Sequence, residues 1–213
     1  MAEFAIVESG SITSMPKGNK GVKIGNYNYP PAVFTLWTEA ERNAVGIYTV
    51  EIDNTNKKHE EWYYNTAITY SYDASSNKVK GAYGTATAKA HADAKWTQSE
   101  IDNGDAPSGA DTNTVKKEGL KTILIRQVKR DAESILNKTD WYITRKAEKS
   151  TAIPSAITTH RDAVRTKQAS METSITNASN TAALETLYTY VNTADEGEPI
   201  VMERPIGVLP SLS

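Results

Sequence analysis

The sequence of 213 residues contains no cysteine, only two phenylalanines and three histidines. The absence of cysteine excludes disulfides, thiolate metal sites and a cysteine nucleophile, so burial and backbone hydrogen bonds must hold the fold. No apolar run approaches the roughly 20 residues that a membrane-spanning helix needs. Glu3 and Glu8 stand where a signal peptide carries Lys or Arg, and we therefore expect neither a membrane span nor a signal peptide.

The charge balance shows no large excess of either sign. The chain has 24 Lys and Arg against 26 Asp and Glu, a formal net charge of −2. A protein that binds nucleic acid or an anionic membrane surface usually carries a strong basic excess or a basic face. We therefore expect neither nucleic acid nor membrane among the partners of this chain.

The first half of the chain shows the patterns of short strands joined by turns. Residues 4–7 and 11–13 flank a turn that contains a glycine, which predicts an opening hairpin. Between residues 66 and 72, apolar and aromatic side chains alternate with polar ones at the two-residue period of a strand. A polar turn separates this segment from residues 78–85, so a second hairpin is predicted there.

Turn-forming residues mark the limits of further predicted strands and loops in this half. Residues 20–24 predict a strand, and Tyr27 and Tyr29 follow in a predicted loop, 25–31, that ends in two prolines. Residues 86–94 are mostly small or polar, and two readings stay open for them: an edge strand or a linker.

A helix-capping pattern lies between these strands. Thr38 and Glu41 have the spacing of a capping box, which predicts a short helix over 39–45 that ends at Gly46. The β-branched residues between 47 and 52 then predict a further strand.

The second half changes to a helical period. Apolar residues between 120 and 136 recur every three or four positions, which predicts an amphipathic helix. A break at 137–143 places Trp141 at the helix end, where we expect its ring to fix the helical junction. A second helix is predicted over 153–175 and a short third one over 181–191.

The apolar seam of the second predicted helix contains two polar residues, Arg161 and Gln168. Burying a charge without a partner is costly. We therefore expect these side chains to meet another surface or solvent.

The C-terminal segment 196–213 combines three prolines with seven aliphatic residues. It cannot be helical, and a disordered terminus would be more polar, so the pattern indicates an extended arm that needs a surface. The arm either packs back on its own domain or docks on a neighbouring subunit. We expect its removal to leave a folded protein.

These patterns together predict an α+β fold: an N-terminal antiparallel β-rich domain, then a small helical bundle and an extended arm. The predicted boundaries are a β-rich domain over 1–95, a loop or linker over 96–112, a helical domain over 113–195 and a proline-rich assembly arm over 196–213.

No motif in the sequence indicates a reaction. His59, His91 and His160 stand apart from other metal-ligating residues at helical spacing, so no zinc site is predicted. Residues 53–56 and 102–105 lack the ligand pattern of a calcium loop and predict turns. We expect no enzymatic activity, no metal and no cofactor.

The aromatic run Trp62-Tyr63-Tyr64 cannot place all three rings on one face of a strand. At least one ring is therefore expected to reach solvent or a partner. Exposed aromatic rings serve as interface anchors or stack on sugars, and both uses stay open.

Three segments of the second half carry an ordered signature. Residues 135–141 contain an aliphatic pair followed by Thr-Asp-Trp, residues 153–154 contribute a proline, and 160–165 contain Arg-x-x-x-Arg. This order resembles the C-terminal signature of bacteriophage tail-fibre assembly and virion-associated proteins. In that family an aromatic residue commonly precedes the first arginine, whereas this sequence has His160.

Residues 33–37, 46–48 and 53–56 also resemble small structural proteins of marine tailed phages. The resemblance implies a structural virion protein of the tail, baseplate or fibre-attachment apparatus, assembled in the host cytoplasm as a homo- or hetero-oligomer with other tail proteins. A tail-fibre assembly chaperone and a host-glycan-binding module are the alternatives. The residues expected at protein interfaces are Trp62, Tyr63, Tyr64, Trp141, Ile200, Val201, Met202, Ile206, Val208, Leu209 and Leu212.

Overall fold

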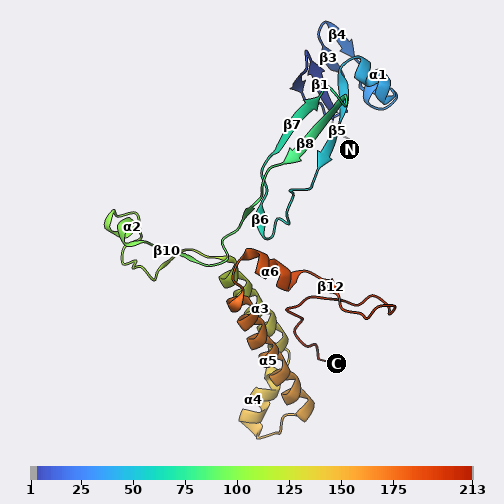
Figure 1. Ribbon diagram of the computed structural model, residues 1–213. Helices are drawn as coiled ribbons and strands as arrows, with labels where there is room; N and C mark the ends of the chain where they lie inside the picture. The colour runs from blue at the N-terminus through green and yellow to red at the C-terminus, as the bar shows by residue number, and fades with distance from the viewer. Residues whose placement is uncertain (1–3, 213) are drawn as a thin grey trace. The chain divides into compact units, whose positions relative to one another are not determined.

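Residues 4–212 of the chain are described by the computed structural model in Figure 1. The chain divides into two compact units, one ending at Thr87 and the other beginning at Ala88. Strands dominate the first unit, and the long helices lie in the second. The predicted α+β class, with a β-rich region followed by helices, is confirmed.

A five-stranded sheet lies at the centre of the first unit. Its strands are β1 (Phe4–Glu8), β2 (Ser11–Ser14), β5 (Ile47–Asp53), β7 (Ile68–Asp73) and β8 (Lys78–Tyr83). They lie in the order β2-β1-β5-β8-β7, and both predicted hairpins are present, since β1 pairs with β2 and β7 with β8. The β5–β8 pair is parallel, which corrects the prediction of a wholly antiparallel domain. The long connection 54–67 lets β7 take the outer edge, so that β8 returns beside β5 in the same direction.

The two faces of this sheet bury two separate apolar clusters. Alternation along β1 sends Ala5 and Val7 to one face and Phe4 to the other. On the first face the edge strands β2 and β7 contact each other, so the sheet curls around its own core. Tyr48 and Tyr72 meet there with ring centroids 5.0 Å apart, and the hydrogen bond between their hydroxyls, together with burial, raises the pKa of Tyr48 to about 12.

A group of short elements covers the second face. They are β3 (Val22–Ile24), β4 (Tyr27–Tyr29), the 3-10 helix η1 (Pro31–Phe34) and α1 (Glu39–Ala44). The predicted loop 25–31 is therefore wrong in part, because Gly25 and Asn26 form a two-residue turn between paired strands. Tyr29 packs edge-on against Trp37, with ring centroids 5.9 Å apart.

The predicted capping box of α1 is confirmed. The side chain of Thr38 accepts a hydrogen bond from the backbone of Glu41, whose carboxylate accepts one from the backbone of Thr38. Gly46 follows the helix at a φ of +84°, and a Cβ there would lie 2.7 Å from the carbonyl oxygen of Val7. Glycine is therefore required where the chain turns into β5.

Ordered structure also occupies the segment predicted as a loop or linker. Strand β6 (Tyr63–Tyr64) pairs with β9 (Thr87–Ala88), which makes part of the 86–94 segment an edge strand. Further on, β10 (Ala94–Lys95) and β11 (Val115–Lys117) form a ladder that brackets helix α2 (Gln98–Asp102). The predicted loop 96–112 is corrected accordingly.

Local contacts stabilise this α2 hairpin. Thr97 and Glu100 form a capping box, a sequence signal that the polar surroundings concealed. Lys116 pairs with Glu100 and lies 4.7 Å from the centroid of the Trp96 ring. The hydrogen bond from Lys116, with those from Thr97, lowers the pKa of Glu100 to about 2.

Two long helices form the body of the second unit. The helices of this unit are α3 (Leu120–Asn137), α4 (Asp140–Lys149), α5 (Ser155–Asn177) and α6 (Thr181–Tyr188). Helices α3 and α5 pack together along the predicted seams, and Gln168 is half-buried at a position where its neighbours in the seam are buried. Helix α4 was not predicted, because residues 137–143 were expected to break the helical pattern, whereas only Lys138 and Thr139 separate α3 from α4.

The segment around Asp93 packs against the beginning of α3. The carboxylate of Asp93 accepts hydrogen bonds from the backbone N–H of Gly119 at 2.7 Å and from the hydroxyl of Thr122 at 2.8 Å. These two bonds lower the pKa of Asp93. Gly119 lies so close to this segment that a Cβ would be 2.3 Å from the carbonyl carbon of Ala92.

The junction between α3, α4 and α5 is held by Arg161. Arg161 is 7% exposed, and its guanidinium donates to the carbonyl oxygen of Leu136 at 2.7 Å and to the hydroxyl of Thr139 at 2.6 Å. It also pairs with the carboxylate of Asp140 at 2.8 Å. The prediction that Trp141 fixes this junction is corrected, because its side chain is 51% exposed.

We expect Arg161→Ala to lower the free energy of unfolding by roughly 2–4 kcal/mol, because it removes the buried side chain that joins the three helices and leaves the 2% exposed Thr139 without this donor. Urea unfolding followed by circular dichroism measures the change. Arg165→Ala, one turn further along α5 and 52% exposed, is the matched control and should change stability by about 0.5 kcal/mol or less. Equal effects of the two substitutions would contradict this role for Arg161.

Asp93 should make stability depend on pH. Its pKa is lowered from an ordinary value of 3.8, so its contribution is present above that pH and is lost as the pH falls further through the folded-state pKa. Asp93→Asn should therefore cost roughly 1–2 kcal/mol at neutral pH and progressively less below about pH 3.8. Paired urea titrations of both proteins measure this, with Asp162→Asn, at a 67% exposed carboxylate, as the control. A difference that stays constant with pH would refute the assignment.

Candidate interaction surfaces

The ribbon, residues 190–204, is a two-stranded hairpin that follows α6. It contains β12 (Val191–Asn192) and β13 (Met202–Glu203), which pair antiparallel. The side-chain oxygen of Asn192 accepts hydrogen bonds from the backbone N–H groups of Ala194 at 3.1 Å and Val201 at 3.0 Å. The backbone N–H of Thr193 donates to the carbonyl oxygen of Val201 at 2.8 Å. These bonds give the ribbon a defined shape.

The root of the ribbon is attached to α6. The guanidinium of Arg204 lies 5.9 Å from the ring centroid of Tyr188 and 5.4 Å from that of Tyr190. The backbone N–H of Ile206 then donates to the carbonyl oxygen of Leu187 at 3.0 Å. The hairpin therefore leaves its own helix in a fixed direction.

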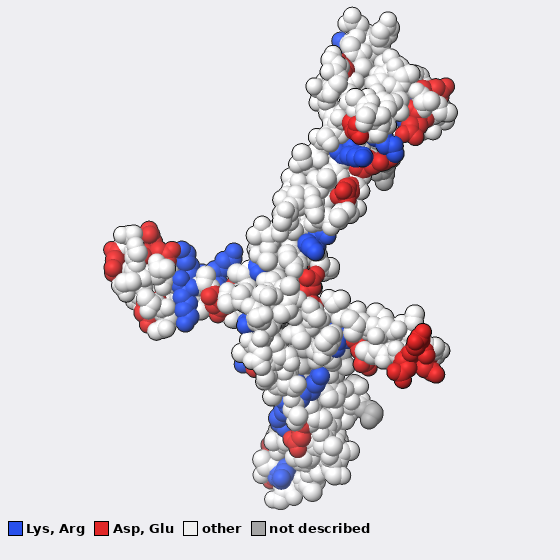
Figure 2. Space-filling model, in the orientation of Figure 1, with Lys and Arg blue, Asp and Glu red and all other residues white. Residues whose placement is uncertain are grey.

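The ribbon exposes apolar side chains beside acidic ones. Exposed fractions run from 43% to 75% for the apolar residues Tyr190, Val191, Ile200, Val201 and Met202. Figure 2 shows acidic side chains gathered at the turn of this hairpin, where Asp195, Glu196 and Glu198 are exposed. A grouped apolar surface of this kind marks an interaction site more often than isolated exposed residues do.

Part of the C-terminal arm beyond the ribbon packs on its own unit, although Leu212 is itself 50% exposed. Ile206 is 2% exposed, and Leu209 and Leu212 line a cleft of about 370 Å³ together with Ile135 and His160. The reading in which the arm folds back is thus correct for this part. Deleting the whole arm would remove the buried Ile206 side chain, so we expect the deletion to lower the stability of the helical unit.

Helix α4 carries an exposed aromatic face that the sequence reading only partly identified. The rings of Trp141 and Tyr142 lie 3.8 Å apart between centroids, and the guanidinium of Arg145 lies 4.7 Å from the Trp141 ring and 5.2 Å from the Tyr142 ring. Ile143 is also 43% exposed. The i, i+4 spacing of Trp141 and Arg145 was the available signal for this face.

The aromatic run at 62–64 divides between core and surface. Trp62 is 3% exposed, Tyr63 is half-buried and Tyr64 is 55% exposed. Trp62 and Ile206 are therefore buried within the chain, and neither side chain is available to a partner. Val208, by contrast, is 65% exposed and remains available to a partner.

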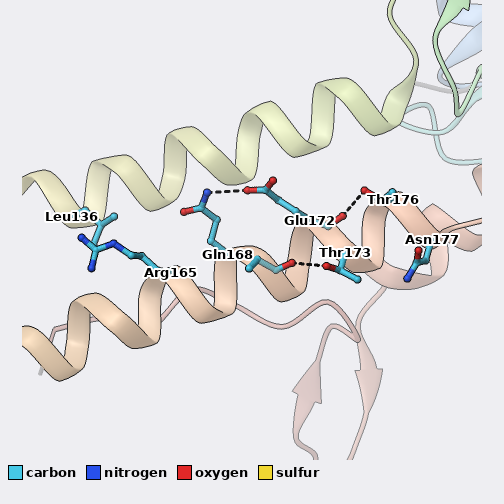
Figure 3. Close-up of a pocket in the computed structure, with 8 residues that line it drawn as sticks. Leu136, Arg165, Gln168, Glu172, Thr173, Thr176 and Asn177 are labelled. Carbon is cyan, nitrogen blue, oxygen red and sulfur yellow. Dashed lines mark hydrogen bonds between the residues drawn. The ribbon is translucent and has the colours of Figure 1, made fainter.

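A polar groove of about 690 Å³ runs between α3 and α5 (Figure 3). Gln168 donates to Glu172 at 2.8 Å, and Glu172 also pairs with Lys129 at 3.5 Å. Arg165, at the same groove, pairs with Asp162 at 3.3 Å. The charged groups that line the groove are thus already matched within the helix pair.

The residues considered for metal binding form local structure. The carboxylate of Asp53 accepts from the backbone N–H and the hydroxyl of Thr55, which is the predicted turn. Within residues 4–212, no cluster of three or more His, Asp or Glu side chains is placed to bind a metal ion. No helix in that range has the length and apolarity to cross a membrane.

Comparison of the chain with protein-family models gives no match. Comparisons with curated proteins and with solved structures also give none.

We expect two isoleucines of the C-terminal arm to respond differently to truncation. Ile206→Ala should lower the free energy of unfolding by roughly 2–4 kcal/mol, because it empties a buried position. Ile200→Ala, at a side chain that is 75% exposed, should change it by about 0.5 kcal/mol or less. Chemical unfolding of both variants measures the contrast, and a large loss at Ile200 would show that the ribbon is covered within its own chain.

Proposed function

We propose that this chain is a structural component of a tailed-phage virion, in the tail, baseplate or fibre-attachment apparatus. It acts through contacts between subunits. The observation that carries the proposal is the amount of surface that the chain leaves to solvent.

The chain exposes 13,892 Å². A compact monomer of 23.3 kDa would expose about 9,700 Å², and two separate compact units of half that mass would expose about 11,700 Å² together. The surface therefore exceeds what division into two units accounts for. Proteins that are built into assemblies cover such surface with neighbouring subunits.

The ribbon supports the same function by its chemistry. Its apolar side chains are held in solvent by a hairpin whose shape is fixed by backbone and Asn192 hydrogen bonds. Two-stranded ribbons are marginally stable alone. A neighbour that covers this one would bury apolar area and stabilise it at the same time.

The phage assignment rests on the resemblance of residues 135–165. Within that segment, Thr139, Asp140 and Arg161 make the contacts that join α3, α4 and α5. The residues of the signature thus have a structural role in this chain, which supports a structural rather than a catalytic reading of it.

Mass spectrometry of purified phage particles tests the location. We expect the protein in the particle, at a copy number comparable with that of other tail proteins. Absence from particles combined with abundance in infected cells would reject the proposal and favour a tail-fibre assembly chaperone.

The role of the ribbon is tested by incorporation. The triple variant Ile200→Thr, Val201→Thr and Met202→Thr should fold normally yet enter particles at least about tenfold less, because the apolar contact is lost. The measure is the amount of each variant in particles made by complementation of a deletion phage. Leu36→Thr, at a 79% exposed side chain of the other unit, is the control and should enter normally. Equal incorporation of the triple variant and the control would show that the apolar side chains of the ribbon are not needed for assembly.

A further inference from the structure

One exposed face of α4, here called the α4 face, carries Trp141, Arg145 and Lys149 and so combines an aromatic ring with basic groups, which the exposed ribbon residues do not. Trp141, Arg145 and Lys149 are spaced i, i+4 and i+8 and so lie on one side of the helix. The Arg145 guanidinium is stacked on the aromatic rings, and its buried Nε donates to no acceptor among the described residues. An interface rich in Trp, Tyr and Arg is the composition in which binding energy concentrates.

The net charge of this face is positive. Lys146 and Lys149 are exposed, with Glu148 as the opposing acid between them. The carboxylate of Asp140, at the start of the helix, is already paired with the buried Arg161. The ribbon offers the opposite combination, apolar side chains beside the exposed carboxylates of its turn.

We propose that the ribbon of one copy of this chain docks on the α4 face of a second copy. The inference rests on the proposed function, because it names the partner in the subunit contact. Ile200 and Met202, which alternate with Val201 along the hairpin, would cover the Trp141 ring, and the carboxylates of Glu196 and Glu198 would meet Arg145 and Lys149.

The geometry of the helical unit favours a second copy over the same chain. The ribbon leaves from α6, which packs at the C-terminal end of α5, whereas α4 precedes the N-terminal end of α5. With 23 residues, α5 separates these ends by about 34 Å. Figure 1 shows α4 and α6 at opposite ends of the α3–α5 pair.

The proposed contact joins two different surfaces, so a pair of copies keeps one free ribbon, on one copy, and one free α4 face, on the other. Such a head-to-tail contact repeats, and it closes into a ring or continues as a row. Each surface is a single hairpin or a short helix, which places the contact at the small end of protein interfaces. We therefore expect association that depends strongly on protein concentration.

Sedimentation velocity of the full-length protein over a concentration series tests the proposal. The wild-type protein should grow beyond the monomer mass as its concentration rises. Two variants should each associate at least about tenfold more weakly: Trp141→Ala with Arg145→Ala, and Ile200→Thr with Met202→Thr. Circular dichroism and thermal unfolding establish that both are folded.

Mixing the two variants gives the decisive measurement. The first variant keeps an intact ribbon and the second keeps an intact α4 face, so an equimolar mixture should form a one-to-one complex and grow no further. A loss of folding cannot produce this result. A mixture that remains monomeric while the wild-type protein associates would overturn the proposed pairing of surfaces.

The charges are tested separately. Glu196→Gln with Glu198→Gln should weaken association and reduce its dependence on salt, whereas Glu133→Gln on α3 should leave both unchanged. Equal effects of these two variants would show that the carboxylates of the ribbon do not pair with the basic groups of the α4 face.

The two proposals can fail independently. A wild-type protein that stays monomeric throughout the series but is present in particles would overturn docking between copies and assign the ribbon to another virion protein. Association in solution by a protein absent from particles would leave the docking intact and overturn the virion function.

Discussion

Burial is scarce in this chain, and that constraint explains how its elements are held. With 13,892 Å² exposed, thin elements cannot depend on a large common core. Each is therefore secured by specific local bonds: Arg161 at the junction of three helices, Asp93 at the opposite end of the helix pair, and two capping boxes at the short helices. A hydrogen bond to a charged group contributes more than a neutral one, which suits charged side chains to positions where little apolar area is available.

The two units bury their apolar side chains in different ways. The first unit uses both faces of one sheet, so that neighbouring residues of β1 serve separate apolar clusters. The second unit has a single seam between α3 and α5, and a two-helix seam leaves the outer faces of both helices in solvent. The seam can accept the buried guanidinium of Arg161 because the end of α3 offers it two acceptors, the hydroxyl of Thr139 and the carbonyl of Leu136, which Thr139 shares. The same contact fixes where α4 begins, and so where its aromatic face points.

Features of the sequence that act over a few residues predicted the structure well, and non-local ones did not. The capping box at Thr38 and the alternation before Tyr72 need only neighbours in sequence, and both predictions are confirmed. The identical signal at Thr97 was missed because polar, turn-forming residues surround it. The parallel pairing of β5 with β8 depends on where a long connection leads, which no local pattern encodes. The sequence showed that Arg161 needs a partner, but its acceptors lie more than twenty positions away.

The sequence predicted a set of residues at protein interfaces, but it could not predict which of them would be buried and which would be exposed. Ile206 and Ile200 have the same side chain and lie in the same proline-rich segment, yet one is buried and the other exposed. The difference arises because the backbone N–H of Ile206 bonds to Leu187 at the end of α6, while Ile200 lies beyond the root of the hairpin. This attachment would matter for the proposed docking, because a pre-shaped ribbon loses less conformational entropy on docking than a disordered arm would. A chain that is poor in burial can thus present its apolar residues to a partner in a fixed arrangement.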